Sequence, residues 1–180
     1  MSKSILITGG VSSGKSRFAV SYFAGCDYVL YLKVGTQVDK DLIHRIEFAN
    51  EKHGVEWDIV TTEQMTPAEL VTDHKFVIFD SLSAFTRLAM KQLSPDAAPD
   101  EAKKKEIEKR VIDEVKAVEE RVAENNGSLI IITVETGFSS TADDSMVSAY
   151  RDILGRVNQR IANTTDEVFF SASGIQFKIK

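Results

Sequence analysis

The sequence contains little cysteine, little proline and no excess of positive charge. One cysteine, Cys26, stands among 180 residues, which excludes an intrachain disulfide and a cysteine-rich zinc site. The 22 Lys and Arg side chains are outnumbered by 27 Asp and Glu side chains, for a net charge of −5, and an acidic chain lacks the electrostatic footprint of a nucleic-acid-binding protein. Its apolar runs are far shorter than the about 20 residues of a membrane span. We therefore expect a cytoplasmic protein with neither a membrane nor a nucleic acid as partner.

The composition is sufficient for one ordinary hydrophobic core. Hydrophobic residues make up 43% of the chain, close to the average of globular domains, which excludes wholesale disorder. A length of 180 residues predicts a single domain over residues 1–180. The one loop-like shift in composition, residues 93–100, carries two of the three prolines and is expected to be a surface connection.

Short apolar runs alternate with longer amphipathic stretches, which is typical of an α/β fold with a mostly parallel sheet flanked by helices. The predicted strands are residues 4–8, 28–33, 76–80 and 129–134. The predicted helices are residues 15–24, 39–52, 83–92, 103–125 and 145–163. Two final apolar runs, residues 168–170 and 175–179, flank Ser173 and Gly174. This arrangement predicts a C-terminal antiparallel hairpin.

A glycine-rich motif lies between the first predicted strand and the first predicted helix. The pattern G-x-x-x-x-G-K-[ST] is matched by Gly9, Gly10, Val11, Ser12, Ser13, Gly14, Lys15 and Ser16. In such a P-loop the backbone amides point at phosphates, the lysine (Lys15) reaches the β- and γ-phosphates, and the hydroxyl (Ser16) ligates Mg²⁺. The alternative is a glycine-rich turn with a solvated lysine. The position in the chain favours a P-loop NTPase-like fold that uses ATP or GTP.

Two acidic residues follow apolar runs and are candidates for the same site. Asp80 ends the run Phe76–Asp80, which has the form of a Walker B strand whose carboxylate helps hold Mg²⁺. Its alternative role is to cap the helix that follows. Glu135 follows the run at 129–134 and should also lie at the carboxyl edge of the sheet, where α/β proteins bind ligands. Glu135 could instead be a solvated turn residue.

The C-terminal part of the chain narrows the function further. Residues 150–160 read YRDILGRVNQR and are followed by Asp166-Glu167-Val168 and Ser173-Gly174-Ile175. This pattern closely resembles the bifunctional adenosylcobinamide kinase/adenosylcobinamide-phosphate guanylyltransferase family of cobalamin biosynthesis. The resemblance extends over nearly the whole chain, through the segments Thr8 to Arg17, Asp80 to Ser83 and Glu135 to Gly137.

The resemblance implies a chemistry of two steps. A nucleoside triphosphate phosphorylates the aminopropanol hydroxyl of adenosylcobinamide, and GMP then passes from GTP to that phosphate through a guanylyl-histidine. It also implies a homotrimer, a nucleotide contact from Arg17, and a substrate cleft that includes Arg45, His53, Arg151 and Asp152. Read without the family, His53 is a surface histidine. Asp152, four residues before Arg156, would then form an exposed ion pair on a helix.

The chain departs from the family at the position of the guanylylated histidine. An ungapped alignment of residues 39–57 matches Arg45-Ile46 and Trp57 to the family and puts the histidine position at Ala49, which has no nucleophile. His53 lies one helical turn further on, whereas His44 should point elsewhere. We therefore expect a nucleotide-dependent kinase whose guanylyltransferase step is doubtful. The alternative is a catalytically degraded paralogue that binds nucleotide in a regulatory or structural role.

Overall fold

The computed structural model describes residues 2–137 and 144–180 and contains one seven-stranded sheet of order β3-β2-β4-β5-β1-β6-β7. The strands are β1 (Lys3–Gly9), β2 (Val29–Val34), β3 (Trp57–Thr62), β4 (Phe76–Asp80), β5 (Ser128–Ile132), β6 (Glu167–Ala172) and β7 (Ile175–Lys178). All neighbouring strands are parallel except β6 and β7. The predicted mostly parallel sheet with a C-terminal antiparallel hairpin is confirmed.

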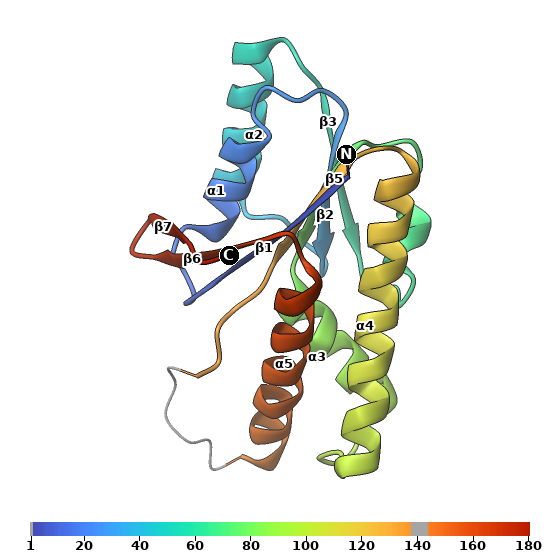
Figure 1. Ribbon diagram of the computed structural model, residues 1–180. Helices are drawn as coiled ribbons and strands as arrows, with labels where there is room; N and C mark the ends of the chain where they lie inside the picture. Colours follow the sequence, from blue (N-terminus) through green and yellow to red (C-terminus); the bar gives the residue numbers. More distant parts are fainter. Residues whose placement is uncertain (1, 138–143) are drawn as a thin grey trace.

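Helices cover both faces of the sheet (Figure 1). They are α1 (Lys15–Tyr22), α2 (Lys40–His53), α3 (Leu82–Leu93), α4 (Glu101–Glu124) and α5 (Ser145–Thr164), with one 3₁₀ turn at Pro67–Leu70. Figure 1 shows α1 and α2 on one side of the sheet and α3, α4 and α5 on the other. In the part of the chain that is described, no helix is both long and apolar enough to cross a membrane.

Alternating strand residues produce two hydrophobic cores. Leu6, Phe79 and Ile131 face the layer of α3, α4 and α5, whereas Ile7 and Ile130 face the layer of α1 and α2. Because consecutive strand side chains point to opposite faces, a strand covered on both sides must be apolar throughout. The continuous runs in β1, β4 and β5 meet that condition, which explains why these strands were predictable.

The sequence did not predict β3, and the reason is its position. This strand, WDIVTT, lies at the edge of the sheet and is only partly buried. An edge strand can keep polar residues because one of its sides has no strand to cover it. Its composition therefore shows neither a continuous apolar run nor a clear alternation. The 3₁₀ turn at Pro67–Leu70 was likewise not predicted.

The order of the strands brings the candidate acids close to the glycine-rich loop. Strand β5 lies between β1 and β4 and runs parallel to both. The carboxyl ends of these three strands therefore share one edge of the sheet, where Gly9, Asp80 and the chain leading to Glu135 emerge.

Candidate functional site

The glycine-rich loop wraps around the ammonium group of Lys15. This side chain is buried, and its Nζ donates to the carbonyl oxygens of Gly9 (3.1 Å) and Gly10. It also lies 3.4 Å from the Ser13 hydroxyl. Burial lowers the pKa of Lys15, and the charge of Asp80 partly opposes that shift. The loop thus holds a cation beside the start of α1, where the helix dipole also favours an anion.

Two glycines are required by the backbone of this loop. Gly9 has φ +143°, and a Cβ there would lie 2.2 Å from the Ser171 carbonyl oxygen of β6. Gly14 caps α1 in the left-handed region, at φ +97°. A Cβ on Gly14 would lie 3.2 Å from the Cα of Gly174. The motif therefore needs glycine both for its own turn and for the close approach of the C-terminal hairpin.

The C-terminal hairpin is hydrogen-bonded to the P-loop. The Ser171 hydroxyl donates to the Ser13 carbonyl oxygen (2.7 Å), and the backbone N–H of Gly174 donates to the same oxygen (2.9 Å). Ser171 is fully buried. These contacts orient the peptide that precedes Gly14 and so fix the entry into α1. Sequence analysis predicted the hairpin but not this contact.

Asp80 lies at the centre of a compact polar cluster. Its Oδ2 accepts from the Ser16 hydroxyl of α1 (3.4 Å), from the buried Tyr31 hydroxyl, and from Lys33 Nζ (3.0 Å). The Asp80 side chain is 6% exposed and that of Lys33 is 27% exposed. Burial, followed by the charge of Asp80, raises the pKa of Tyr31, so this hydroxyl stays protonated and donates a hydrogen bond to the carboxylate. Ser16 and Asp80, predicted as partners, thus lie side by side.

The capping role that was an alternative for Asp80 belongs to its neighbour. Ser81 is the N-cap of α3, and its hydroxyl accepts from the backbone N–H of Ala84 (3.2 Å). The carboxylate of Asp80 instead faces α1. Tyr31 and Lys33 were not identified from the sequence, although β2 pairs with β4 so that Lys33 lies opposite Asp80. Only this pairing, between residues far apart in the sequence, brings them together.

Glu135 lies just beyond β5, beside the P-loop. Its backbone N–H donates to the Gly9 carbonyl oxygen (3.1 Å), and its Oε1 accepts from the N–H groups of Thr136 (2.9 Å) and Gly137 (3.0 Å). Asn158 of α5 donates to the Val134 carbonyl oxygen (3.0 Å) and so braces the segment that leads to Glu135. A cavity of about 380 Å³ adjoins Glu135 and Thr136. Glu135 is therefore held in place next to open space.

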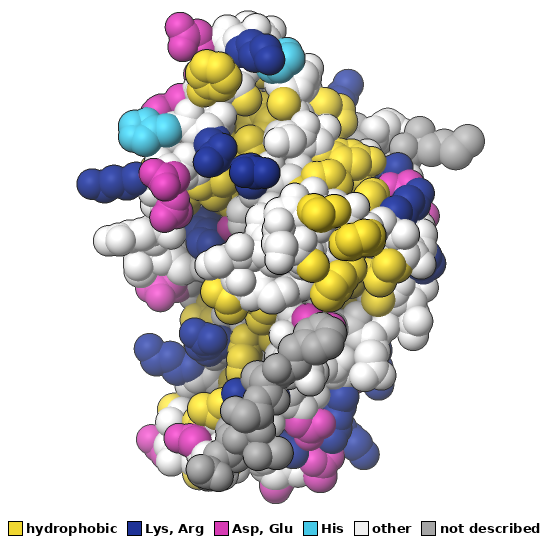
Figure 2. All heavy atoms as spheres, turned by 90° about the vertical axis from the view of Figure 1, so that its left-hand side faces the viewer, with side chains coloured by type: hydrophobic (Ala, Val, Ile, Leu, Met, Phe, Trp, Pro, Cys, Tyr) yellow, Lys and Arg dark blue, Asp and Glu magenta, His cyan; other side chains and the backbone are white. Residues whose placement is uncertain are grey.

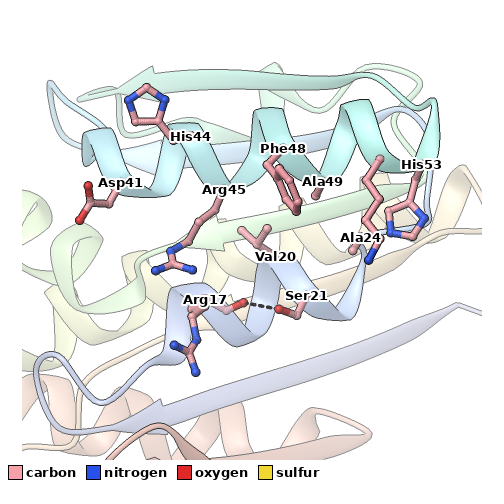
Figure 3. A pocket seen from close by; sticks show the side chains of 11 residues that line it. Arg17, Val20, Ser21, Ala24, Asp41, His44, Arg45, Phe48, Ala49 and His53 are labelled. Carbon is pink, nitrogen blue, oxygen red and sulfur yellow. Dashed lines mark hydrogen bonds between the residues drawn. The ribbon is translucent and has the colours of Figure 1, made fainter.

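A groove of about 620 Å³ separates α1 from α2 (Figure 3). Arg45 and Phe48 point from α2 toward α1, and Ala49 lies beside them, whereas His44 points away. Phe48 is 68% exposed. His53 lies at the far end of the groove. Arg17 joins this groove to the P-loop, because it lines the groove and belongs to the first turn of α1.

The four residues expected in the substrate cleft lie in three places. Arg45 and His53 line the α1–α2 groove, whereas Arg151 lines a hollow between α3 and α5. Asp152 forms ion pairs with Lys104 of α4 (2.9 Å) and with Arg156 (2.9 Å). The structure thus brings together only the first pair, and the ion pair that was the alternative reading of Asp152 is present.

The oxygen donors at the loop suit Mg²⁺. In the described segments, no three His, Cys, Asp or Glu side chains gather as a metal site. This is compatible with Mg²⁺, which proteins commonly hold through one or two carboxylates, with substrate phosphates and water as the remaining ligands. Ser16 and Asp80 offer a hydroxyl and a carboxylate of that kind. Lys33 does not suit a metal site, because its ammonium contacts the Asp80 carboxylate oxygen that would bind Mg²⁺.

The sequence has recognisable relatives over almost its full length. Residues 5–179 match the family described as "Cobinamide kinase / cobinamide phosphate guanyltransferase". The bifunctional adenosylcobalamin biosynthesis protein CobU of Salmonella typhimurium is 27% identical over 180 residues, which cover 98% of this chain and 99% of that protein. The CobU protein of Escherichia coli K12 is 27% identical over 179 residues with the same coverage.

A solved structure supports the fold at lower identity. An ATPase from the type III secretion system of pathogenic bacteria superposes with a TM-score of 0.59 at 13% identity. The match covers 93% of this chain and 51% of the ATPase chain, so the present chain spans about half of that protein. At this identity the likeness shows the fold alone.

Proposed function

The chain belongs to the cobinamide kinase / cobinamide phosphate guanyltransferase family, and we propose that it is a transferase of cobalamin biosynthesis that phosphorylates a cobinamide-like alcohol. The observation that carries this proposal is the assembly of Lys15, Ser16 and Asp80 at one edge of the sheet. The donor is a nucleoside triphosphate, ATP or GTP, bound with Mg²⁺. Residues 1–180 act as one nucleotide-binding unit.

The loop residues hold the triphosphate. The backbone amides of residues 9 to 17 contact the phosphates. The Lys15 ammonium, which donates to the Gly9 and Gly10 carbonyl oxygens in the structure, turns from them to the phosphates. Ser16 and Asp80 hold Mg²⁺, which when bound neutralises charge on the phosphate oxygens. Arg17 extends the contact toward the α1–α2 groove. These groups orient the donor for in-line transfer.

Glu135 is proposed as the base of the kinase step. Its fixed position beside the P-loop, next to a cavity, supports this role. The acceptor oxygen forms a bond to the γ-phosphorus while the bond from that phosphorus to the β,γ-bridging oxygen breaks. The nucleoside diphosphate leaves, and the hydroxyl proton passes to the carboxylate. Arg45, His53, Arg151 and Asp152 remain proposals for contacts with the acceptor, an adenosylcobinamide-like corrinoid.

Guanylyl transfer is proposed to be absent or impaired. The groove residues Arg17 and Arg45 could hold an anion, but Ala49 supplies no imidazole. The nearest alternative, His53, lies at the far end of the groove. A histidine relay needs a neutral imidazole in line with the α-phosphate, and the observed lining of the groove favours its loss.

A homotrimer is the proposed assembly. Ile175, Phe177 and Ile179, at the hairpin edge of the sheet, are 60%, 52% and 64% exposed. Figure 2 shows hydrophobic side chains gathered on the face that carries α1, α2 and the hairpin. An exposed apolar edge strand is normally covered, which supports association of identical chains. Light scattering at micromolar concentration tests the proposal, and a monomer would contradict it.

The decisive experiment is turnover with a defined acceptor. Purified protein is incubated with Mg²⁺ and either ATP or GTP, with and without adenosylcobinamide, and products are separated by mass. We expect a product heavier by one phosphoryl group, formed only when all components are present. Nucleotide binding without any phosphorylated product would instead support the degraded paralogue with a regulatory or structural role.

A further inference from the structure

Among the residues that the structure describes, Lys33 is the one cation in the Asp80 cluster that the P-loop motif does not account for. It lies on β2, opposite Asp80 in the strand register. Its Nζ is 3.0 Å from Asp80 Oδ2, the same oxygen that meets the Ser16 hydroxyl at 3.4 Å. The Lys33 ammonium and the Ser16 hydroxyl are therefore close neighbours, because both contact the same carboxylate oxygen. A cation thus already lies beside the two proposed ligands of Mg²⁺.

The three donors on this oxygen differ in their freedom to leave. Tyr31 is fully buried, and its ring is fixed among core residues. Ser16 is part of the first turn of α1. The Lys33 side chain is 27% exposed and ends a flexible four-carbon stem. Lys33 is therefore the partner that can exchange.

We propose that Lys33 is a second phosphate-site cation: in the metal-free protein it neutralises Asp80, so that a triphosphate can bind beside this carboxylate, and it gives up Asp80 when Mg²⁺ takes its place. This inference rests on the proposed nucleotide site. A nearly buried carboxylate without a cation is costly, so Lys33 stabilises Asp80 before metal arrives. The same charge then offsets part of the negative charge of a triphosphate. Two consequences follow: nucleotide binds appreciably without Mg²⁺, and Mg²⁺ alone binds weakly because it competes with an ammonium.

The test separates metal-free binding from metal-dependent binding. Calorimetry with non-hydrolysable ATP and GTP analogues is run in EDTA and in excess Mg²⁺ for the wild type, Lys33→Met and Lys33→Arg. For Lys33→Met we expect at least about a tenfold loss of affinity in EDTA, with less than about a threefold loss in Mg²⁺. Lys33→Arg should stay within about threefold of the wild type in both conditions. Equal losses in EDTA and Mg²⁺, or no loss in either, would overturn the proposal.

A second measurement needs no nucleotide. Mn²⁺ is titrated against the nucleotide-free proteins and followed by electron paramagnetic resonance. Lys33→Met should bind Mn²⁺ at least about threefold more tightly than the wild type, because the competing charge is gone. Equal or weaker binding would contradict the proposal.

The matched control is Lys75→Met. Lys75 is exposed and immediately precedes β4, at the end of the strand opposite Asp80, so this variant makes the same charge change away from the site. It should behave as the wild type in both titrations, and a shift equal to that of Lys33→Met would overturn the proposal. If circular dichroism shows Lys33→Met unfolded, Lys33→Gln, which keeps a donor for Asp80, replaces it with the same expected directions.

The outcomes also distinguish this inference from the proposed function. A wild type that binds neither analogue in either condition contradicts both. Binding that depends on Lys33 as described, together with no phosphorylation of adenosylcobinamide, supports the inference and contradicts the proposed kinase. Binding that is indifferent to Lys33, together with turnover, does the reverse.

Discussion

The P-loop and the α1–α2 groove meet at Arg17, yet they are constructed differently. At the P-loop, polar groups are buried and bonded to one another: Lys15 to loop carbonyls, and Asp80 to Ser16 and Lys33. In the groove, Phe48 and His53 are exposed, and Ala49 adds no polar group. Buried polar networks fix geometry, whereas exposed side chains on a helix face can be replaced at little cost to folding. The difference indicates that the fold constrains the geometry of the P-loop more tightly than that of the groove.

Removal of the Lys15 charge from the P-loop should have the largest effect on nucleotide affinity. Lys15→Ala removes the cation that faces the phosphates, and we expect at least about a 100-fold loss of ATP and GTP affinity, about 2.7 kcal/mol. Calorimetry in Mg²⁺ buffer measures it, with Lys75→Ala as the charge-matched control. Circular dichroism should show an unchanged fold. Wild-type affinity in Lys15→Ala would disprove the assignment of the P-loop.

The α1–α2 groove should not support covalent guanylylation, although the P-loop should bind nucleotide. After incubation with GTP and Mg²⁺, intact-mass spectrometry should find no covalent GMP adduct on the wild type, because Ala49 has no nucleophile. His53 is displaced from position 49 by one turn, about 6 Å along the helix axis, compared with a reactive contact of about 3 to 3.5 Å.

Two variants sharpen that result. Any GMP adduct on a wild-type histidine would contradict the prediction, and its loss in His53→Ala would identify the substitute nucleophile. Ala49→His tests whether the groove still holds GTP in line. An adduct on this variant alone would show that the missing imidazole is the groove's main defect.

The contact between hairpin and P-loop should have an intermediate effect. Ser171→Ala removes the buried hydroxyl that donates to Ser13, and we expect a loss of about 1 to 1.5 kcal/mol in the free energy of unfolding. Nucleotide affinity should fall with it, because the orientation of the loop depends on this contact. Urea unfolding and calorimetry provide the two values. The exposed Ser21→Ala on α1 is the control, and an effect on stability without any on affinity would disprove the coupling.

Acid should break the ion pairs that join Glu167 of β6 to Lys178 of β7 and to Lys3 of β1. Hydrogen bonds from Lys178 and then Lys3 lower the pKa of Glu167, so the folded state binds its proton less readily than the unfolded state. This contribution to stability is present above the unfolded-state pKa of about 4.3 and is lost as the pH falls through the lower folded-state value. Glu167→Gln should therefore flatten the acid limb of the stability profile. An unchanged profile would contradict this interpretation.

The smallest effect is expected at Asp152. Its ion pairs with Lys104 and Arg156 are partly exposed, and such pairs contribute less than about 1 kcal/mol. Asp152→Asn should lower the midpoint of urea unfolding only slightly. A change in the KM for the acceptor beyond about threefold, with nucleotide affinity constant, would instead support a place in the substrate cleft.

The predictable parts of the molecule were those that local sequence specifies. The P-loop is one contiguous motif. Strands β1, β4 and β5 are continuous apolar runs, as expected for strands covered by helices on both faces. Lys33 and Tyr31 were missed because their meeting with Asp80 depends on the pairing of β2 with β4. Similarly, β3 carries the mixed composition of an edge strand. The expected substrate-cleft residues separated onto different helix faces, since a one-dimensional pattern does not state which helices pack together.

The bond between Ser171 and Ser13 joins residues 158 positions apart, and this has a consequence for how the protein is made. Along the chain, the P-loop precedes the hairpin that orients it, so it leaves the ribosome earlier. Contacts of such high sequence separation form late in folding. We therefore expect nucleotide to bind chains synthesised beyond residue 174 more tightly than shorter ones and, by mass action, to stabilise the longer chains more.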